Sequence, residues 1–204
     1  MPAPYAQSVF INCPFDRRYA PMFRAIVFVV HDLGFVPRCA LEVSDATQNR
    51  YQKILGIIGQ CRYGIHDISR TEPGRYGLPR FNMPLELGLF LGAKAFGDPE
   101  QHQKAGLILD RLPYRYQRFI SDLAGQDVKA HRDSPEQAIR VVRDWLRTTS
   151  RRTRIPGGDA VVRRYRGFRR ELPSIARRLS LRVDEMPFLD YTEIVLDWLR
   201  VNAP

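Results

Sequence analysis

Five short apolar segments alternate with helical patterns over the first 147 residues, and this alternation limits the possible folds more than any other feature. Parallel strands need long crossover connections, usually helices, so the alternation favours a parallel sheet covered on both faces. We therefore expect an α/β, flavodoxin-like fold with about five strands and helices on both faces of the sheet. The expected strands are residues 8–12, 35–41, 62–68, 105–110 and 127–131.

Apolar residues recur at helical spacing between and after these strands. The expected helices are residues 21–33, 48–61, 82–96, 114–124, 135–147, 159–179 and 187–201, with a break or kink at Pro173. Residues 148–158 are polar and basic and end in Pro-Gly-Gly, which indicates a linker. We expect a flavodoxin-like nucleoside- or nucleotide-binding domain over residues 1–150 and a small helical C-terminal unit over residues 158–204. Limited proteolysis should cut between Arg151 and Arg154.

The most apolar helix expected runs through Arg80–Lys94, with the sequence Arg-Phe-Asn-Met-Pro-Leu-Glu-Leu-Gly-Leu-Phe-Leu-Gly-Ala-Lys. We expect Asn82 to be its N-cap and Glu86 to be a lone carboxylate in its first turn. Such a carboxylate is either functional or a partner of the helix dipole. Gly88 and Gly92 lie four residues apart, and each costs roughly 1 kcal/mol relative to Ala in a helix. Close packing of this face on the sheet would explain both glycines.

Polar residues follow the strands that should be neighbours at the middle of the sheet. Ligands of such sheets bind beyond the carboxyl ends of the strands, where the strand order reverses. We therefore expect Asp67 and Glu86 to line one cleft with the turn after the first strand. A pair of carboxylates is what glycosidic-bond chemistry uses, which makes these two the candidate catalytic residues. The candidate binding residues are Asn12, Cys13, Pro14, Phe15, Asp16, Arg70 and Asn82.

Composition and motifs narrow the function classes. The net charge is +10, which suits anionic ligands or nucleic acid, although solvated arginine-rich helices explain it equally well. No Gly-rich phosphate loop, zinc-ligand spacing or Ser/His/Asp order is visible, so we expect no metal and no cofactor. The longest apolar run, Ala25–Val30, is too short to span a membrane. Three cysteines without metal-ligand spacing and no expected signal peptide favour a cytoplasmic protein.

Three short motifs carry a family resemblance. They are Phe10-Ile-Asn-Cys-Pro-Phe-Asp16, Asp67 at the end of a strand, and Leu85-Glu-Leu-Gly88 in a helix. Together they resemble the nucleoside 2-deoxyribosyltransferase-like family, which is close to the TIR-like domains, over residues 8–147. The resemblance implies a Pro-Phe turn after the first strand and a catalytic role for Glu86. The chain departs from the family pattern at Arg80, where relatives have an Asp six residues before the Glu.

The resemblance also implies a reaction. Its members act on the N-glycosidic bond of nucleosides or nucleotides, and some relatives cleave NAD in bacterial antiviral defence. We therefore expect an enzyme that cleaves or transfers such a bond, with a nucleoside, a nucleotide or NAD as ligand. The alternative is a non-catalytic nucleotide-sensing or protein-interaction module of the same fold. Among other partners, a homo-oligomer fits either function, nucleic acid is less favoured, and no membrane contact is expected.

Overall fold

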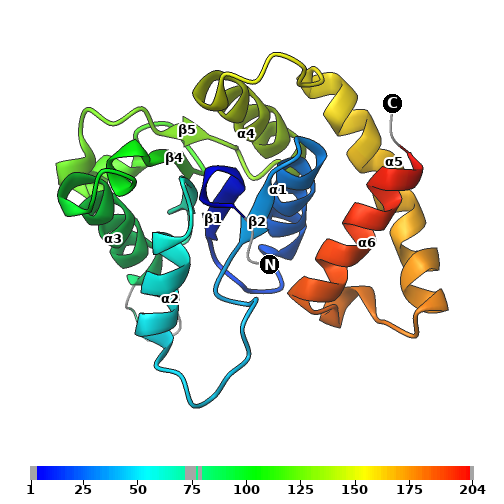
Figure 1. Cartoon of the computed structure of the whole chain (residues 1–204). Coiled ribbons are helices and arrows are strands. Elements are labelled where there is room, and N and C mark those ends of the chain that lie inside the picture. Colours follow the sequence, from blue (N-terminus) through cyan, green and yellow to red (C-terminus); the bar gives the residue numbers. More distant parts are fainter. Residues whose placement is uncertain (1–3, 72–76, 78–79, 203–204) are drawn as a thin grey trace.

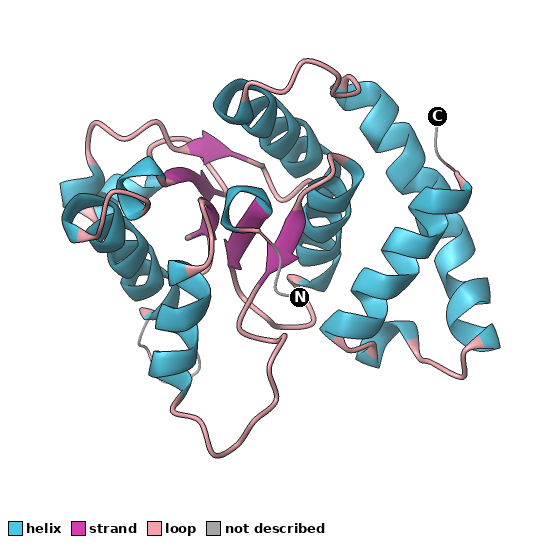
Figure 2. Cartoon of the chain, in the orientation of Figure 1, coloured by secondary structure: helices cyan, strands magenta, loops and turns pink. Residues whose placement is uncertain are grey.

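A computed structural model of the chain describes residues 4–71, 77 and 80–202, and it confirms the α/β, flavodoxin-like fold (Figures 1 and 2). Five parallel strands form one sheet in the order β2-β1-β3-β4-β5. The strands are β1 (Ser8–Asn12), β2 (Val36–Arg38), β3 (Tyr63–Asp67), β4 (Ala105–Asp110) and β5 (Lys129–Ala130). The helices are α1 (Ala20–Asp32), α2 (Arg50–Gly59), α3 (Asn82–Phe96), α4 (Pro135–Ser150), α5 (Gly158–Arg178) and α6 (Phe188–Val201).

Both faces of the sheet are covered, so its central strands are apolar on both sides. Every residue of β1 is buried. Val9 and Ile11 pack in the core that contains α1 and α4, whereas Phe10 packs in a second cluster with α2 and Phe90 of α3. This opposite direction of neighbouring side chains follows from the two-residue repeat of a strand. It places the carboxyl ends of β1 and β3 at one edge, where the strand order reverses.

The segment expected as a helix over residues 114–124 forms two short 3₁₀ helices instead, Arg115–Arg118 and Ser121–Leu123. The backbone at Ile120 turns to φ −139° and ψ 73°, which no α-helix accommodates. This turn lets Tyr116 and Leu123 pack into one apolar cluster with Ile68 at the end of β3. Tertiary packing therefore overrides the local helical pattern here.

Two expectations about α3 are wrong. Asn82 is its first residue rather than its N-cap, so Glu86 is the fifth residue and lies outside the first turn. A Cβ atom added at Gly88 or Gly92 would meet nothing within 4 Å, so these glycines do not pack against the sheet. The close approach occurs on the strand instead, because a Cβ at Gly64 would lie 2.7 Å from the Phe90 ring.

The C-terminal helices share the core of the sheet domain. Phe28 of α1 packs against Tyr165 and Phe168 of α5 and Trp198 of α6, with ring centroids 5.2, 5.3 and 6.1 Å away. The helix α5 continues through Pro173 without the expected break. The helical unit begins where the Pro-Gly-Gly signal placed it, but its inner face is part of the main apolar core. No helix within the described residues combines the length and apolarity that a membrane span requires.

The linker between α4 and α5 is fastened to the sheet domain by one arginine. Nη1 of Arg152 donates to the carbonyls of Leu33 (2.8 Å) and Gly34 (3.2 Å), and the guanidinium lies 4.0 Å from the centre of the Phe35 ring. Arg151 and Arg154 on either side are exposed. Opening of the linker must therefore break the Arg152 contacts first.

We expect Arg152→Gln to accelerate tryptic cleavage at Arg151 and Arg154 several-fold, because local opening then loses fewer contacts. The measurement is a time course of limited trypsin digestion, with fragments identified by mass spectrometry. Arg178→Gln, on the exposed side of α5, is the matched control and should leave the rate unchanged. Equal cleavage rates in the wild type and in Arg152→Gln would show that Arg152 does not hold the linker.

Candidate functional site

Asn12 connects the reversal point of the sheet to α3. Its Nδ2 atom donates to the Met83 carbonyl at 2.8 Å and lies 3.1 Å from Nδ1 of His66. Burial and the nearby charge of Lys104 lower the pKa of His66 to about 3, so its ring is neutral and Nδ1 accepts. Asn12 is itself buried. It therefore positions the start of α3 and has almost no surface for a ligand.

Cys13 lies among the carboxylates that the sequence predicted to converge. Burial raises the pKa of its thiol well above the usual range, and the negative charges of Asp67, Glu86 and Asp16 add to the effect. These three carboxyl groups are thus close enough to the thiol to influence its ionisation. Because the thiol stays protonated and buried, Cys13 is a packing residue rather than a ready nucleophile.

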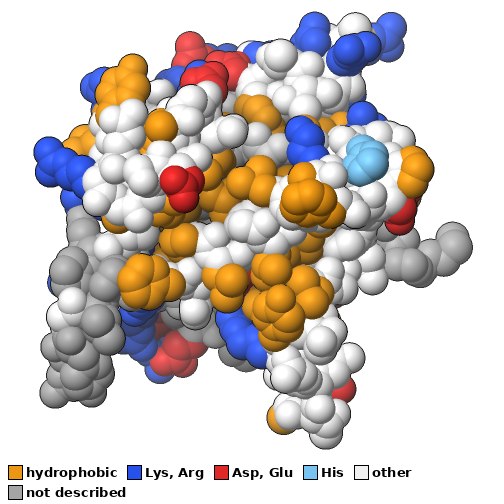
Figure 3. All heavy atoms as spheres, turned by 90° about the vertical axis from the view of Figure 1, so that its left-hand side faces the viewer, with side chains coloured by type: hydrophobic (Ala, Val, Ile, Leu, Met, Phe, Trp, Pro, Cys, Tyr) orange, Lys and Arg blue, Asp and Glu red, His pale blue; other side chains and the backbone are white. Residues whose placement is uncertain are grey.

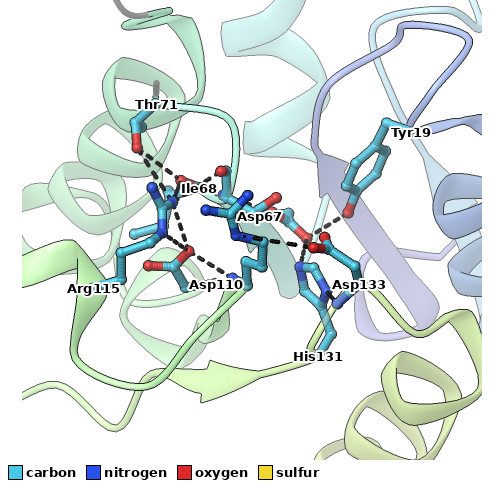
Figure 4. Close-up of polar contacts among 10 residues, drawn as sticks. Tyr19, Asp67, Ile68, Thr71, Asp110, Arg115, His131 and Asp133 are labelled. Atoms are coloured by element: carbon cyan, nitrogen blue, oxygen red, sulfur yellow. Dashed lines mark hydrogen bonds and ion pairs between the residues drawn. The ribbon is translucent and has the colours of Figure 1, made fainter. Parts of the chain in front are cut away.

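Asp67 is completely buried at the end of β3 (Figure 4). Its Oδ1 atom accepts from the Ser69 backbone N–H at 2.8 Å. Its Oδ2 atom accepts from the Tyr19 hydroxyl at 2.5 Å and lies 3.0 Å from Nε2 of His131. Burial raises the pKa of Asp67, but the hydrogen bonds from His131, Ser69 and Tyr19 outweigh it, so the pKa falls below its ordinary value. Asp67 is an ionised group with no surface for a substrate.

His131 and Asp110 complete a polar network that the sequence did not predict (Figure 4). Nδ1 of His131 accepts from the Asp133 backbone N–H at 3.1 Å, which leaves the proton on Nε2, facing Asp67. The guanidinium of Arg115 joins Oδ1 of Asp110, at 2.7 Å, to the Ile68 carbonyl, at 3.0 Å. The network ties the carboxyl ends of β3, β4 and β5 together. Its only signal in the sequence was an Asp or His at the end of each strand.

Glu86 lies at a hollow of about 360 Å³ between α2 and α3. The hollow, called the Glu86 hollow below, is lined by Asn49, Arg50, Tyr51, Ile54, Asn82, Leu85, Glu86 and Leu89. Apolar side chains form much of its wall, Arg50 supplies a positive charge, and the Tyr51 ring is 46% exposed. Glu86 and Asn82 are the two predicted site residues that line it. The sequence missed Arg50 and Tyr51, although they open a helix capped by Asn49, a typical anion-binding position.

The Glu86 carboxyl is poised between its two protonation states. Burial raises its pKa to about 7, against a smaller lowering by Arg50. Within the described residues no group hydrogen-bonds to this carboxyl, and only 9% of the residue is exposed. The charge that we expected at neutral pH is therefore present in about half of the molecules at pH 7. A carboxyl with such a pKa suits proton transfer or charge stabilisation at physiological pH.

The other predicted binding residues lie elsewhere. Pro14, Phe15 and Asp16 line a separate hollow of about 170 Å³ against α1 and residues 184–191 of the C-terminal unit. Asp16 also pairs with Arg80, whose Nη1 atom lies 3.3 Å from Oδ2 of the carboxylate. Arg70 is half-buried, and its charge acts on the Tyr19 hydroxyl. The single cleft expected from the sequence is thus divided into two hollows and a buried polar network.

Comparisons with protein families, with curated proteins and with solved structures found no match. The family resemblance therefore depends on the three motifs within residues 8–147 alone. Within the described part of the chain, no group of three or more His, Cys, Asp or Glu side chains is placed to hold a metal ion. The functional argument consequently starts from the geometry of the Glu86 hollow.

Proposed function

We propose that the chain is a nucleoside 2-deoxyribosyltransferase-like enzyme that cleaves or transfers an N-glycosidic bond of a nucleoside or nucleotide bound in the Glu86 hollow. One observation carries the proposal: an unpaired, desolvated carboxyl with a pKa of about 7 lies beside an arginine and an exposed aromatic ring. A nucleotide offers a partner for each of these groups. The motifs that resemble the family include this same Glu86.

Each group of the hollow has a role in the proposal. The Tyr51 ring stacks on the base, since base–aromatic stacking tolerates any base. Arg50, at the first position of α2, binds phosphate with help from the positive end of the helix dipole. The ionised Glu86 then stabilises, or bonds to, the positively charged sugar carbon that forms as the base leaves. In hydrolysis, a water molecule supplies a hydroxyl to that carbon and releases a proton.

The burial of Asp67 favours NAD among the candidate substrates. Most bases leave a sugar as anions unless an acid protonates them, which calls for a second catalytic group. Nicotinamide in NAD is a cationic ring and leaves as a neutral molecule, so one carboxylate is enough. Asp67 has no surface for a substrate, and Glu86 is the carboxyl that lines the hollow. NAD therefore requires the least of this site.

The test is incubation of the chain with a panel of nucleosides, nucleotides and NAD, followed by chromatography for free base. We expect base release, with NAD as the best substrate, and its loss in Glu86→Gln. Glu193→Gln, which changes an exposed carboxyl of α6, is the matched control and should retain full activity. Ligands that raise the melting temperature without any base release would favour the non-catalytic nucleotide-sensing module instead.

A further inference from the structure

The outward side of α3 is apolar along its whole length. Phe81, Leu85 and Phe96 are 65, 55 and 90% exposed, and they share one stripe of the helix with Gly88 and Gly92. These five residues are called the α3 outer face below. The two charged residues of the helix, Glu86 and Lys94, follow or precede a glycine of the stripe by two positions, which is about 200° around the helix. The stripe itself carries no charge.

A helix that is apolar all round is normally covered on every side. On the part of the surface that Figure 3 shows, hydrophobic side chains cover a broad central area, and most Lys and Arg side chains lie at its margin. This view faces the side of the molecule on which α2 and α3 lie (Figure 1). Apolar areas of this kind mark interaction sites.

The two glycines have no explanation within the chain. Gly88 is exposed, Gly92 is half-buried, and a Cβ atom at either would meet no atom within 4 Å. Almost any residue except Pro would favour the helix more than Gly at such positions. Glycine is the best choice there only if another backbone approaches closely, as at helix crossings with small residues four apart.

We propose that a second copy of this chain covers the α3 outer face, with the two α3 helices crossing at Gly88 and Gly92. The stripe is self-complementary, because small residues lie at its centre and Phe81, Leu85 and Phe96 lie toward its ends. An isologous interface uses the same patch on both subunits. A face without charge also matches the core of homodimer interfaces, which are depleted in charged residues.

The charge distribution supports this occupant. The chain carries a net charge of +10, so two copies repel each other unless their basic regions are far apart. Residues 148–204 hold 12 Arg and 7 acidic residues, a net charge of +5. These residues form α5, α6 and their linkers, on the opposite side of the molecule from α3 (Figure 1). Association through α3 keeps these basic regions apart.

The inference stands apart from the proposed catalytic function, since it uses none of the chemistry of Glu86. The two sites are nevertheless adjacent, because Leu85 belongs to the α3 outer face and also lines the Glu86 hollow. The second copy would therefore border the hollow.

The test is sedimentation velocity of the full chain over a range of concentrations, for the wild type and for the double variant Gly88→Gln with Gly92→Gln. We expect the wild type to reach twice the chain mass of 23.6 kDa and the double variant to stay at the chain mass. The variant should also melt at a higher temperature at concentrations where both are monomers, because Gln favours the helix. Gly56→Gln on α2, where a Cβ also meets nothing, is the matched control. It should raise the melting temperature without changing the mass.

Three results would overturn the proposal. They are a wild type that stays monomeric at every concentration, a double variant that dimerises like the wild type, and a Gly56→Gln variant that loses the dimer equally. Leu85→Gln provides a second test that leaves the glycines in place, and it should weaken dimerisation at least tenfold. The base-release assay on the same samples separates this proposal from the proposed function, since dimerisation is measured without any substrate.

Discussion

Glu86→Gln is expected to lower the rate of base release by about 10²-fold or more, a loss of roughly 2.7 kcal/mol of transition-state stabilisation. The glutamine has the shape of the carboxylate but no charge, so ground-state binding should change little. The variant should also be at least as stable as the wild type. The raised pKa of Glu86 means that burial disfavours its charged form, so removal of the charge relieves the folded state at neutral pH. Turnover and urea unfolding measure the two effects.

The pH dependence gives a second, independent readout of the same residue. The folded-state pKa of Glu86 is about 7 and its ordinary value is 4.5. If the ionised form acts, kcat/KM should rise as the pH increases through about 7 and then level off. Stability should change in the opposite direction. Between pH 4.5 and 7 the folded state holds the proton that the unfolded state has lost, so this group makes the protein less stable as the pH rises. A rate that stays constant through pH 7 would show that Glu86 is not the titrating catalytic group.

Asp67→Asn is expected to destabilise the protein by about 3–5 kcal/mol, the usual cost of removing one partner from a buried charged pair. The amide nitrogen would face either the backbone N–H of Ser69 or the Tyr19 hydroxyl and His131 Nε2–H, all of which donate to Asp67. Urea denaturation would measure the loss as a lower midpoint. Asp122→Asn, at an exposed position, is the matched control. An unchanged midpoint in Asp67→Asn would contradict the structural role.

Acid sensitivity distinguishes the same variant further. The pKa of Asp67 is lowered in the folded state, so its contribution to stability is complete above the unfolded value near 3.8 and is lost as the pH falls through the lower folded value. Asp67→Asn should lack this part of the acid transition. A variant with wild-type stability but no base release would instead make Asp67 the second catalytic residue that the sequence predicted.

The sequence by itself determined the sheet and the importance of Glu86. Strands and crossover helices are local patterns, because a short apolar run bounded by turn residues has few other solutions. The rule for parallel sheets then placed Asn12 and Asp67 at one edge, and the structure agrees, with Asn12 beside His66 of β3. Glu86 was found because a single carboxyl in an apolar helix is costly to bury and therefore needs a reason.

Only the tertiary structure decided which groups a ligand can reach. Asp67 is closed off by Tyr19, which is 48 residues away in the chain, and by His131, which follows β5. The raised pKa of Glu86 depends on desolvation in the wall between α2 and α3. The direction of Gly88 and Gly92 was also undetermined by the pattern. A helix that is apolar all round has no preferred inner face, so its packing partners alone decide which side meets the sheet and which side is left for another molecule.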